Sequence, residues 1–302
     1  MFTELLLDIN SAQTKRLAHI DFRVNFLGNI GRNDLIARYG IKEAAATRDI
    51  AEYRKLAPNN LSYDGASKRY TRSDNFEPVF EFTPSQVLTA LSQGLGEDFV
   101  GVHKQFIPCE APAQLQKPSI QVISELSRAI HNKRAVEIKY RSIKSGFTSR
   151  EIIPFVLVNN GLRWHVRAFD RKRTIFSDFV LTRISDPKIV DGEIEEHEMK
   201  DNDIQWNRIV ELELTAHPSL EFPETIEYDY GMEDGVTKVN VRAAIAGYLL
   251  RLWNVDCSKN HSLSSKEVQL WLRNSAALYG VDNNFLAPGY ISDEDNSAPT
   301  GN

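Results

Sequence analysis

The sequence RNDLIARYGIKEAAATRDIAEY, residues 32–53, contains two short apolar-periodic segments with a glycine between them. Apolar side chains recur at helical spacing on either side of Gly40, which permits the left-handed backbone of a tight turn. The expected core members are Leu35, Tyr39, Ile41, Ala46 and Ile50. Two short helices joined in this way are typical of a helix-turn-helix, whose second helix enters the major groove of DNA.

The second of these helices leaves small and basic side chains outside the predicted core. We expect DNA contacts from Lys42, Ala44, Thr47, Arg48, Arg54 and Lys55. An alanine allows a close approach to the bases, and Arg48 can read a guanine through a bidentate contact worth about 1–3 kcal/mol of discrimination. A helical subdomain that binds no DNA is the alternative interpretation of these helices.

A basic hairpin follows directly. Residues 61–70 read LSYDGASKRY, two short strand segments around an Asp-Gly turn. Its Lys68 and Arg69 suit a contact with a phosphate or with the minor groove. A hairpin directly after a helix-turn-helix is the order of the winged form, so it favours DNA binding over the plain helical subdomain.

Periodicity and turn residues divide the whole chain into segments. Helices are expected over 11–27, 33–39 and 43–56 before the hairpin, and over 84–95 and 119–131 after it. The predicted fold class is α+β multidomain. The expected domains are a winged helix-turn-helix over 1–83, a helical linker over 84–118, a small β-barrel over 119–192, a C-terminal α+β unit over 204–290 and a flexible tail over 291–302.

The middle of the chain changes to a period of two. VEIKYRS at 136–142 and LRWHVRA at 162–168 alternate apolar and polar residues, and further strands are expected over 152–158 and 174–184. Several short strands with tight turns predict a small barrel.

Charge is distributed unevenly. The net charge is −5, but residues 119–190 carry 14 Lys and Arg against 6 Asp and Glu, and residues 191–302 carry 8 against 21. The basic block indicates an anionic partner for the middle domain. The chain has only Cys109 and Cys257, no signal peptide and no apolar run near the roughly 18–20 residues of a membrane span, so we expect a cytoplasmic protein without disulfides.

The strands of the middle domain carry candidate ligand-binding residues. Alternation places His165 and Arg167 on one strand face and Trp164 on the other. If the polar faces converge, they form a cationic pocket with an aromatic wall, which suits a phosphate-bearing nucleotide or single-stranded nucleic acid. The candidate effector-binding residues are Tyr140, Ser142, Arg150, Trp164, His165, Arg167 and Arg183. A place in the barrel core is the alternative for Trp164.

The same strands resemble those of the WYL-domain transcriptional regulators. The similar segments are VEIKYRS at 136–142, IPF at 153–155, GLRWHVRA at 161–168 and FVLTRI at 179–184. APNNLSYD at 57–64 is similar to the wing entry of the repressors that accompany the BREX and CBASS anti-phage systems. The naming tripeptide Trp-Tyr-Leu is Trp164-His165-Val166 here, which changes a phenol to an imidazole in the expected ligand site.

The resemblance implies a winged helix-turn-helix, a small Sm-like or SH3-like barrel, and a C-terminal extension that we expect to dimerise the chain. It implies a homodimeric repressor of a phage-defence operon that reads a pseudo-palindromic DNA operator and responds to a nucleotide-like or nucleic-acid effector. The main alternative is a single-stranded nucleic-acid or RNA-binding module that uses the basic barrel. A nuclease is a third possibility, but the sequence contains no metal-binding carboxylate cluster and no catalytic motif. We therefore expect that the protein is not an enzyme and that it binds no metal and no cofactor.

Overall fold

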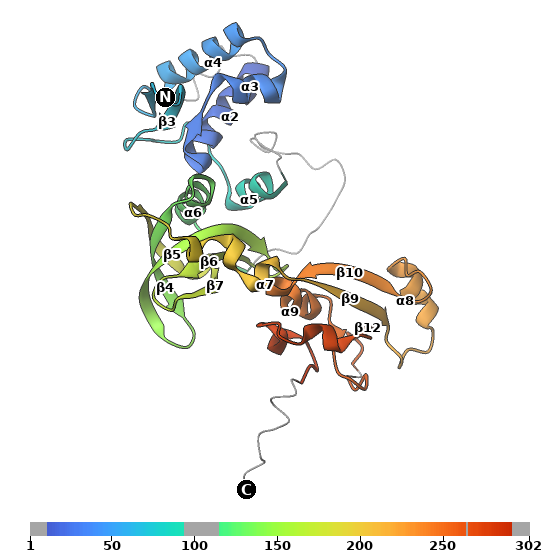
Figure 1. Ribbon diagram of the computed structural model, residues 1–302. Coiled ribbons are helices and arrows are strands. Elements are labelled where there is room, and N and C mark those ends of the chain that lie inside the picture. Colours follow the sequence, from blue (N-terminus) through green and yellow to red (C-terminus); the bar gives the residue numbers. More distant parts are fainter. Residues whose placement is uncertain (1–10, 94–114, 264, 292–302) are drawn as a thin grey trace. The chain divides into compact units, whose positions relative to one another are not determined.

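The computed structural model describes residues 11–93, 115–263 and 265–291, and the expected flexible tail falls almost entirely outside them. The chain forms two compact units: residues 1–158 with 164–194, and residues 159–163 with 195–302 (Figure 1). None of the helices in the described ranges has both the length and the hydrophobicity that crossing a bilayer would take.

The first unit begins with three helices and a small sheet. Their bounds are α2 Ser11–Leu27, β1 Asn29–Ile30, α3 Arg32–Tyr39, α4 Glu43–Leu56, β2 Leu61–Asp64 and β3 Arg69–Arg72. Gly40 ends α3 in the left-handed conformation (φ 62°), and its N–H donates to the Ile36 carbonyl. The strands pair antiparallel in the order β1-β3-β2. The predicted winged helix-turn-helix is therefore confirmed.

A five-stranded antiparallel sheet and two helices complete the first unit. Their bounds are α5 Pro84–Gln93, α6 Ile120–Asn132, β4 Ala135–Ser142, β5 Gly146–Asn159, β6 Trp164–Asp170, β7 Ile175–Val180, the 3-10 helix η2 Leu181–Arg183 and β8 Ile184–Val190. The strand order is β7-β6-β5-β4-β8. On β4 the predicted alternation holds, because Val136, Ile138 and Tyr140 are buried while the residues between them are exposed.

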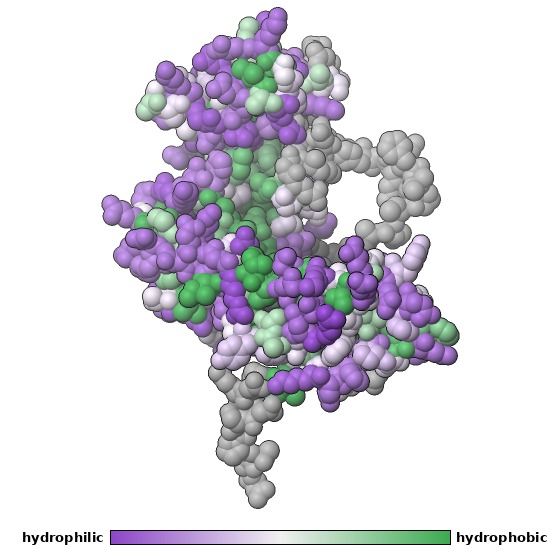
Figure 2. Space-filling model, turned by 45° about the vertical axis from the view of Figure 1, so that its right-hand side comes forward, coloured by the Kyte–Doolittle hydropathy of each residue, from purple (hydrophilic) through white to green (hydrophobic). Residues whose placement is uncertain are grey.

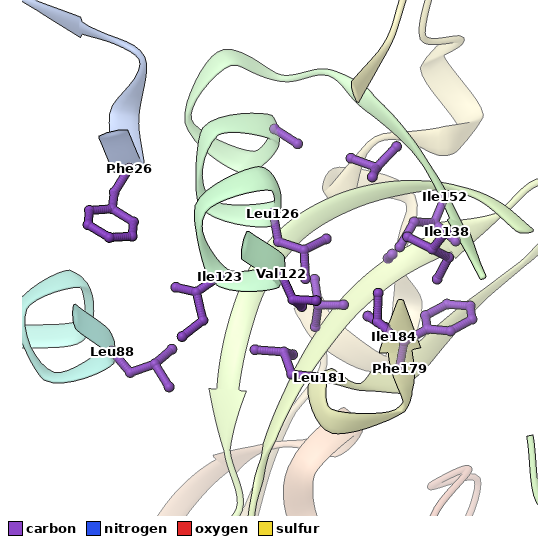
Figure 3. Close-up of a cluster of buried hydrophobic side chains, with 14 of the residues drawn as sticks. Phe26, Leu88, Val122, Ile123, Leu126, Ile138, Ile152, Phe179, Leu181 and Ile184 are labelled. Carbon is purple, nitrogen blue, oxygen red and sulfur yellow. The ribbon is translucent and has the colours of Figure 1, made fainter. Parts of the chain in front are cut away.

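One hydrophobic core joins the winged domain to this sheet. Phe26 of α2 and Leu88 of α5 lie near Ile123 of α6, and α6 in turn covers the sheet (Figure 3). Leu126 is fully buried in the same core. The winged domain and the sheet domain, which the sequence pattern predicts as separate domains, therefore share one hydrophobic core.

The second unit is a mixed α/β domain. Its bounds are η3 Glu196–Glu198, η4 Lys200–Asn202, α7 Ile204–Asn207, β9 Ile209–Ala216, α8 Pro223–Asp229, β10 Thr237–Arg242, α9 Ala243–Leu252, β11 Val255–Asp256, β12 Leu270–Leu272, η5 Ser275–Leu278 and η6 Asn284–Leu286. The sheet order is β10-β9-β12-β11, antiparallel except for the parallel pair of β11 and β12. Helix α9 approaches the 283 region closely, since Asn283 Oδ1 accepts from the Gly247 N–H at 2.9 Å.

Candidate nucleic-acid interface

Helix α4 has one buried face and one exposed face. Ala46, Ile50 and Tyr53 are buried against α2 and α3. The expected DNA-facing residues of α4 and its N-cap are all exposed: Lys42, Ala44, Thr47, Arg48, Arg54 and Lys55. The periodicity therefore assigns the faces of this helix correctly. The winged domain presents a mainly hydrophilic surface in Figure 2.

Side-chain hydrogen bonds hold α4 against α2. Arg16 Nε donates to Asp49 Oδ2 at 2.6 Å, and Asp49 is almost fully buried. Deeper in the core, the Tyr53 hydroxyl donates to Asp21 Oδ1 and accepts from Asn60 Nδ2, the latter at 3.0 Å. A buried polar network of this kind fixes the position of α4, the second helix of the helix-turn-helix and therefore its recognition helix.

The Asp21 carboxylate is fully buried. It also accepts from the N–H groups of Val79 and Phe80, at 3.2 and 3.1 Å. Burial raises the pKa of Asp21 to about 6, although the hydrogen bonds from Tyr53 and from these two N–H groups act in the opposite direction. Sequence reasoning missed this network, because its members lie up to 59 positions apart in the chain.

The wing has a tight, self-capped tip. Asp64 Oδ1 accepts from the Ala66 N–H at 2.9 Å, and its Oδ2 accepts from the Ser67 hydroxyl at 2.6 Å. These hydrogen bonds lower the pKa of Asp64. Lys68 follows in the left-handed region (φ 56°) and is exposed, so its ammonium group is presented at the tip.

Arg69 differs from the expectation. Its Nε donates to Asn29 Oδ1 at 2.9 Å, and its Nη2 forms an ion pair with Asp34 of α3. The side chain is half-buried and turned onto the root of the wing. Arg69 therefore anchors the wing to α3, and the phosphate or minor-groove contact that the sequence suggested for it stays a prediction.

A cleft of about 320 Å³ lies between α4 and the wing, lined by Arg32, Thr47, Ile50, Arg54, Tyr63, Lys68 and Tyr70. The Arg54 guanidinium lies over the Tyr70 ring at 5.7 Å, and the Tyr63 and Tyr70 rings are 5.1 Å apart. Tyr63 is 59% exposed. Arg32 and Tyr63 line this cleft but were not among the DNA contacts expected from the sequence. The alternation of the first wing strand could have indicated that Tyr63 is exposed.

The expected effector residues of the middle domain lie in different local environments. Tyr140 is buried in the core, where its ring packs edge-on to Phe179 and its hydroxyl accepts from the Val180 N–H at 3.3 Å. Ser142 accepts from the N–H groups of residues 144 and 145, at 3.2 Å each, and so closes the β4–β5 turn. Both side chains therefore form hydrogen bonds that stabilise the domain itself.

Two arginines of the central sheet each face a carboxylate. Arg150 Nη1 lies 3.0 Å from Asp170 Oδ2, and Arg167 Nη1 lies 3.0 Å from Asp178 Oδ1. His165 is buried beside Arg167 on β6, whereas Trp164 packs on the opposite, core-facing side. Arg183 is half-buried in η2. An anion at either arginine would have to compete with the resident aspartate.

The described residues contain no cluster of three or more His, Cys, Asp or Glu that could hold a metal ion.

Three family models match the chain in order. They are the BrxR transcriptional regulator winged helix-turn-helix domain over 12–93, the WYL domain over 121–189, and the BrxR transcriptional regulator C-terminal dimerization domain over 209–278. The first two matched ranges lie in the winged part and the sheet part of the first unit, and the third lies in the second unit.

Full-length relatives show the same similarity. The DNA-binding transcriptional repressor CapW of Escherichia coli (strain KTE188) is 33% identical over 279 residues, which covers 89% of this chain and 91% of the relative. CapW of Pseudomonas aeruginosa is 34% identical over 259 residues, covering 81% and 83%. Among solved structures, proteasome accessory factor B/C of Arthrobacter aurescens is 14% identical and covers 90% of this chain and 49% of that one, with a TM-score of 0.27, too low to bear on fold or function.

Proposed function

Because this chain belongs to the BrxR/CapW family of WYL-domain transcriptional regulators, we propose that it represses a phage-defence operon by binding a pseudo-palindromic operator. The chain is a DNA-binding transcriptional repressor that forms a homodimer through its C-terminal domain. Two winged domains in one dimer match two operator half-sites about one helical turn of DNA apart, or a multiple of that spacing.

The exposed face of α4 carries this proposal, because it places basic and small side chains beside the cleft of the wing. Arg48 reads a base edge, and Ala44 allows the helix to lie close to the bases. The phosphate contacts come from Lys42, Thr47, Arg54, Lys55 and Lys68. Arg69 positions the wing from its root.

The WYL domain binds the effector. We propose an anionic, nucleotide-like or single-stranded nucleic-acid ligand, because buried guanidinium groups recognise phosphate well. Arg167 with His165 on one face of β6 is the favoured site, and Arg150 is the second guanidinium. On binding, a phosphate of the ligand would replace the aspartate as the partner of the arginine. The ligand therefore has different affinities for the state of the domain in which the Arg–Asp pair is intact and the state in which it is broken, as regulation requires.

The operator contact is tested by fluorescence anisotropy with duplex DNA from upstream of the chain's own coding region. Arg48→Ala should weaken binding to the operator about tenfold and relax preference at one base position. The matched control is Arg173→Ala, which removes one exposed arginine from the turn after β6 and should leave affinity within about twofold. Equal losses in both variants, or stronger binding to single strands than to the operator, would contradict the proposal.

A further inference from the structure

The C-terminal end of α2 is held by side chains of α6. The last carbonyls of a helix have no intrahelical partner. Here Val24 accepts from the Gly28 N–H at 3.2 Å, but the next three carbonyls accept from another domain. We call this contact the α2–α6 joint, and define it as Asn25, Phe26, Leu27 and Gly28 with Ser124, Ser127, Arg128 and Asn132.

Arg128 is the charged centre of the joint. Its Nη1 donates to the Asn25 carbonyl at 2.6 Å and to the Ser124 hydroxyl, while Nη2 pairs with Glu125. Only 7% of Arg128 is exposed. A cation at a helix C-terminus interacts favourably with the helix dipole, and its hydrogen bonds are stronger than neutral ones.

Two further side chains of α6 donate hydrogen bonds to the last carbonyls of α2. The Ser127 hydroxyl donates to the Phe26 carbonyl at 2.7 Å, and Asn132 Nδ2 donates to the Leu27 carbonyl at 3.2 Å. Gly28 has φ 85°, and a Cβ there would lie 3.3 Å from Asn132 Nδ2. The joint is therefore closely packed as well as hydrogen-bonded.

The joint connects the two functional surfaces. Ile123 and Leu126 of α6 lie in the hydrophobic core that α6 shares with the sheet of the WYL domain and with Phe26 of α2. On the other side, α2 holds the recognition helix through the pairs Arg16–Asp49 and Asp21–Tyr53, described above. The Gly28 carbonyl also accepts from the N–H of residue 72 in the wing strand β3 at 2.9 Å.

We propose that Arg128 is a positioning residue for operator binding: through the α2–α6 joint it fixes the recognition helix and the wing against the WYL domain, so that the WYL domain sets operator affinity. This inference rests on the proposed reading of two half-sites by a homodimer. When both winged domains of the dimer are held rigidly, binding of one half-site gives the second winged domain a high effective concentration at the other half-site. A loose joint weakens binding, because the winged domains then lose orientational entropy when they bind.

The test compares the Kd for a two-half-site operator with the Kd for a single half-site, using the full-length chain. Arg128→Met should weaken binding to the whole operator about tenfold, the loss expected for removing a buried charge-assisted hydrogen bond, and change half-site binding less than about threefold. Arg128→Lys keeps the cation and should restore operator binding to within about threefold of wild type. The matched control is Arg134→Met, because this arginine just after α6 pairs with the exposed Asp191 outside the joint.

The outcomes separate the possible failures. Equal losses on the whole operator and the half-site, or no loss on either, would overturn the role of Arg128 while leaving operator binding by the wild type intact. Absence of operator binding by the wild type would instead overturn the proposed function. If Arg128→Met does not fold, Ser127→Ala removes a single donor and should shift the whole-operator Kd in the same direction by about threefold, with the half-site unchanged.

Discussion

The hydroxyl of Tyr53 links the recognition helix to a buried carboxylate, so we predict that Tyr53→Phe destabilises the winged domain. The hydroxyl donates to Asp21 and accepts from Asn60 Nδ2 at 3.0 Å, and Tyr53 is completely buried. Losing a hydrogen bond to a charged group inside a protein costs about 1.5–3 kcal/mol. A unit of this size loses about 2–4 °C in Tm per kcal/mol, so the expected change is about 3–12 °C.

The matched control is Tyr39→Phe in the same domain. The Tyr39 hydroxyl donates to the Lys15 carbonyl at 3.3 Å in an exposed position, so its removal should cost less than about 0.5 kcal/mol. The assay is urea unfolding of both variants followed by far-ultraviolet circular dichroism at pH 7. Operator affinity should fall in parallel for Tyr53→Phe, because α4 loses a buried hydrogen bond with α2. Free energies of unfolding within about 0.5 kcal/mol of each other would refute the reasoning.

Three further predictions concern other parts of the chain. The pKa of Asp21 is about 6 in the folded chain and about 3.9 when unfolded, so its stabilising effect is complete below pH 4 and is lost as the pH rises through 6. Wild type should therefore gain about 2 kcal/mol over Asp21→Asn between pH 7 and pH 4 in chemical denaturation, and a pH-independent difference would contradict this. Gly247→Ala should destabilise the C-terminal domain by about 3 kcal/mol or more in thermal unfolding, because a Cβ would lie 2.0 Å from the Asn283 carbonyl oxygen; a loss below about 1 kcal/mol would count against that contact. Lys68→Ala should reduce the slope of log affinity for operator against log salt by about 1.8, because each of the two protomers loses one phosphate contact, and an unchanged slope would mean that the wing tip makes no phosphate contact.

The local elements follow from the sequence. Helical spacing and Gly40 predict α3, α4 and the turn between them, and the observed turn is left-handed as required. Alternation on β4 and β6 assigns the correct side chains to each strand face, so Trp164 and His165 lie on opposite sides. These features depend on residues a few positions apart, where spacing alone fixes which side chains share a face.

The positions of the charged groups depend on tertiary structure. Arg69 was expected to contact DNA, but Asp34 and Asn29, which lie 35 and 40 positions earlier, hold it at the wing root. Arg150 and Arg167 were expected to line one pocket if the polar strand faces converge, and the structure shows that each faces its own aspartate. A long side chain reaches any of several partners, and only the packing of distant segments decides which one is present.

The sequence by itself therefore determined the three domains, the recognition helix and its exposed basic face, because each depends on periodicity and turn residues within a short window. Only the tertiary structure decided that Arg128 holds the end of α2 from 103 positions away, and that Asp21 is buried beneath the recognition helix. Burial and long-range hydrogen bonds are properties of the packed chain, and no local pattern encodes them.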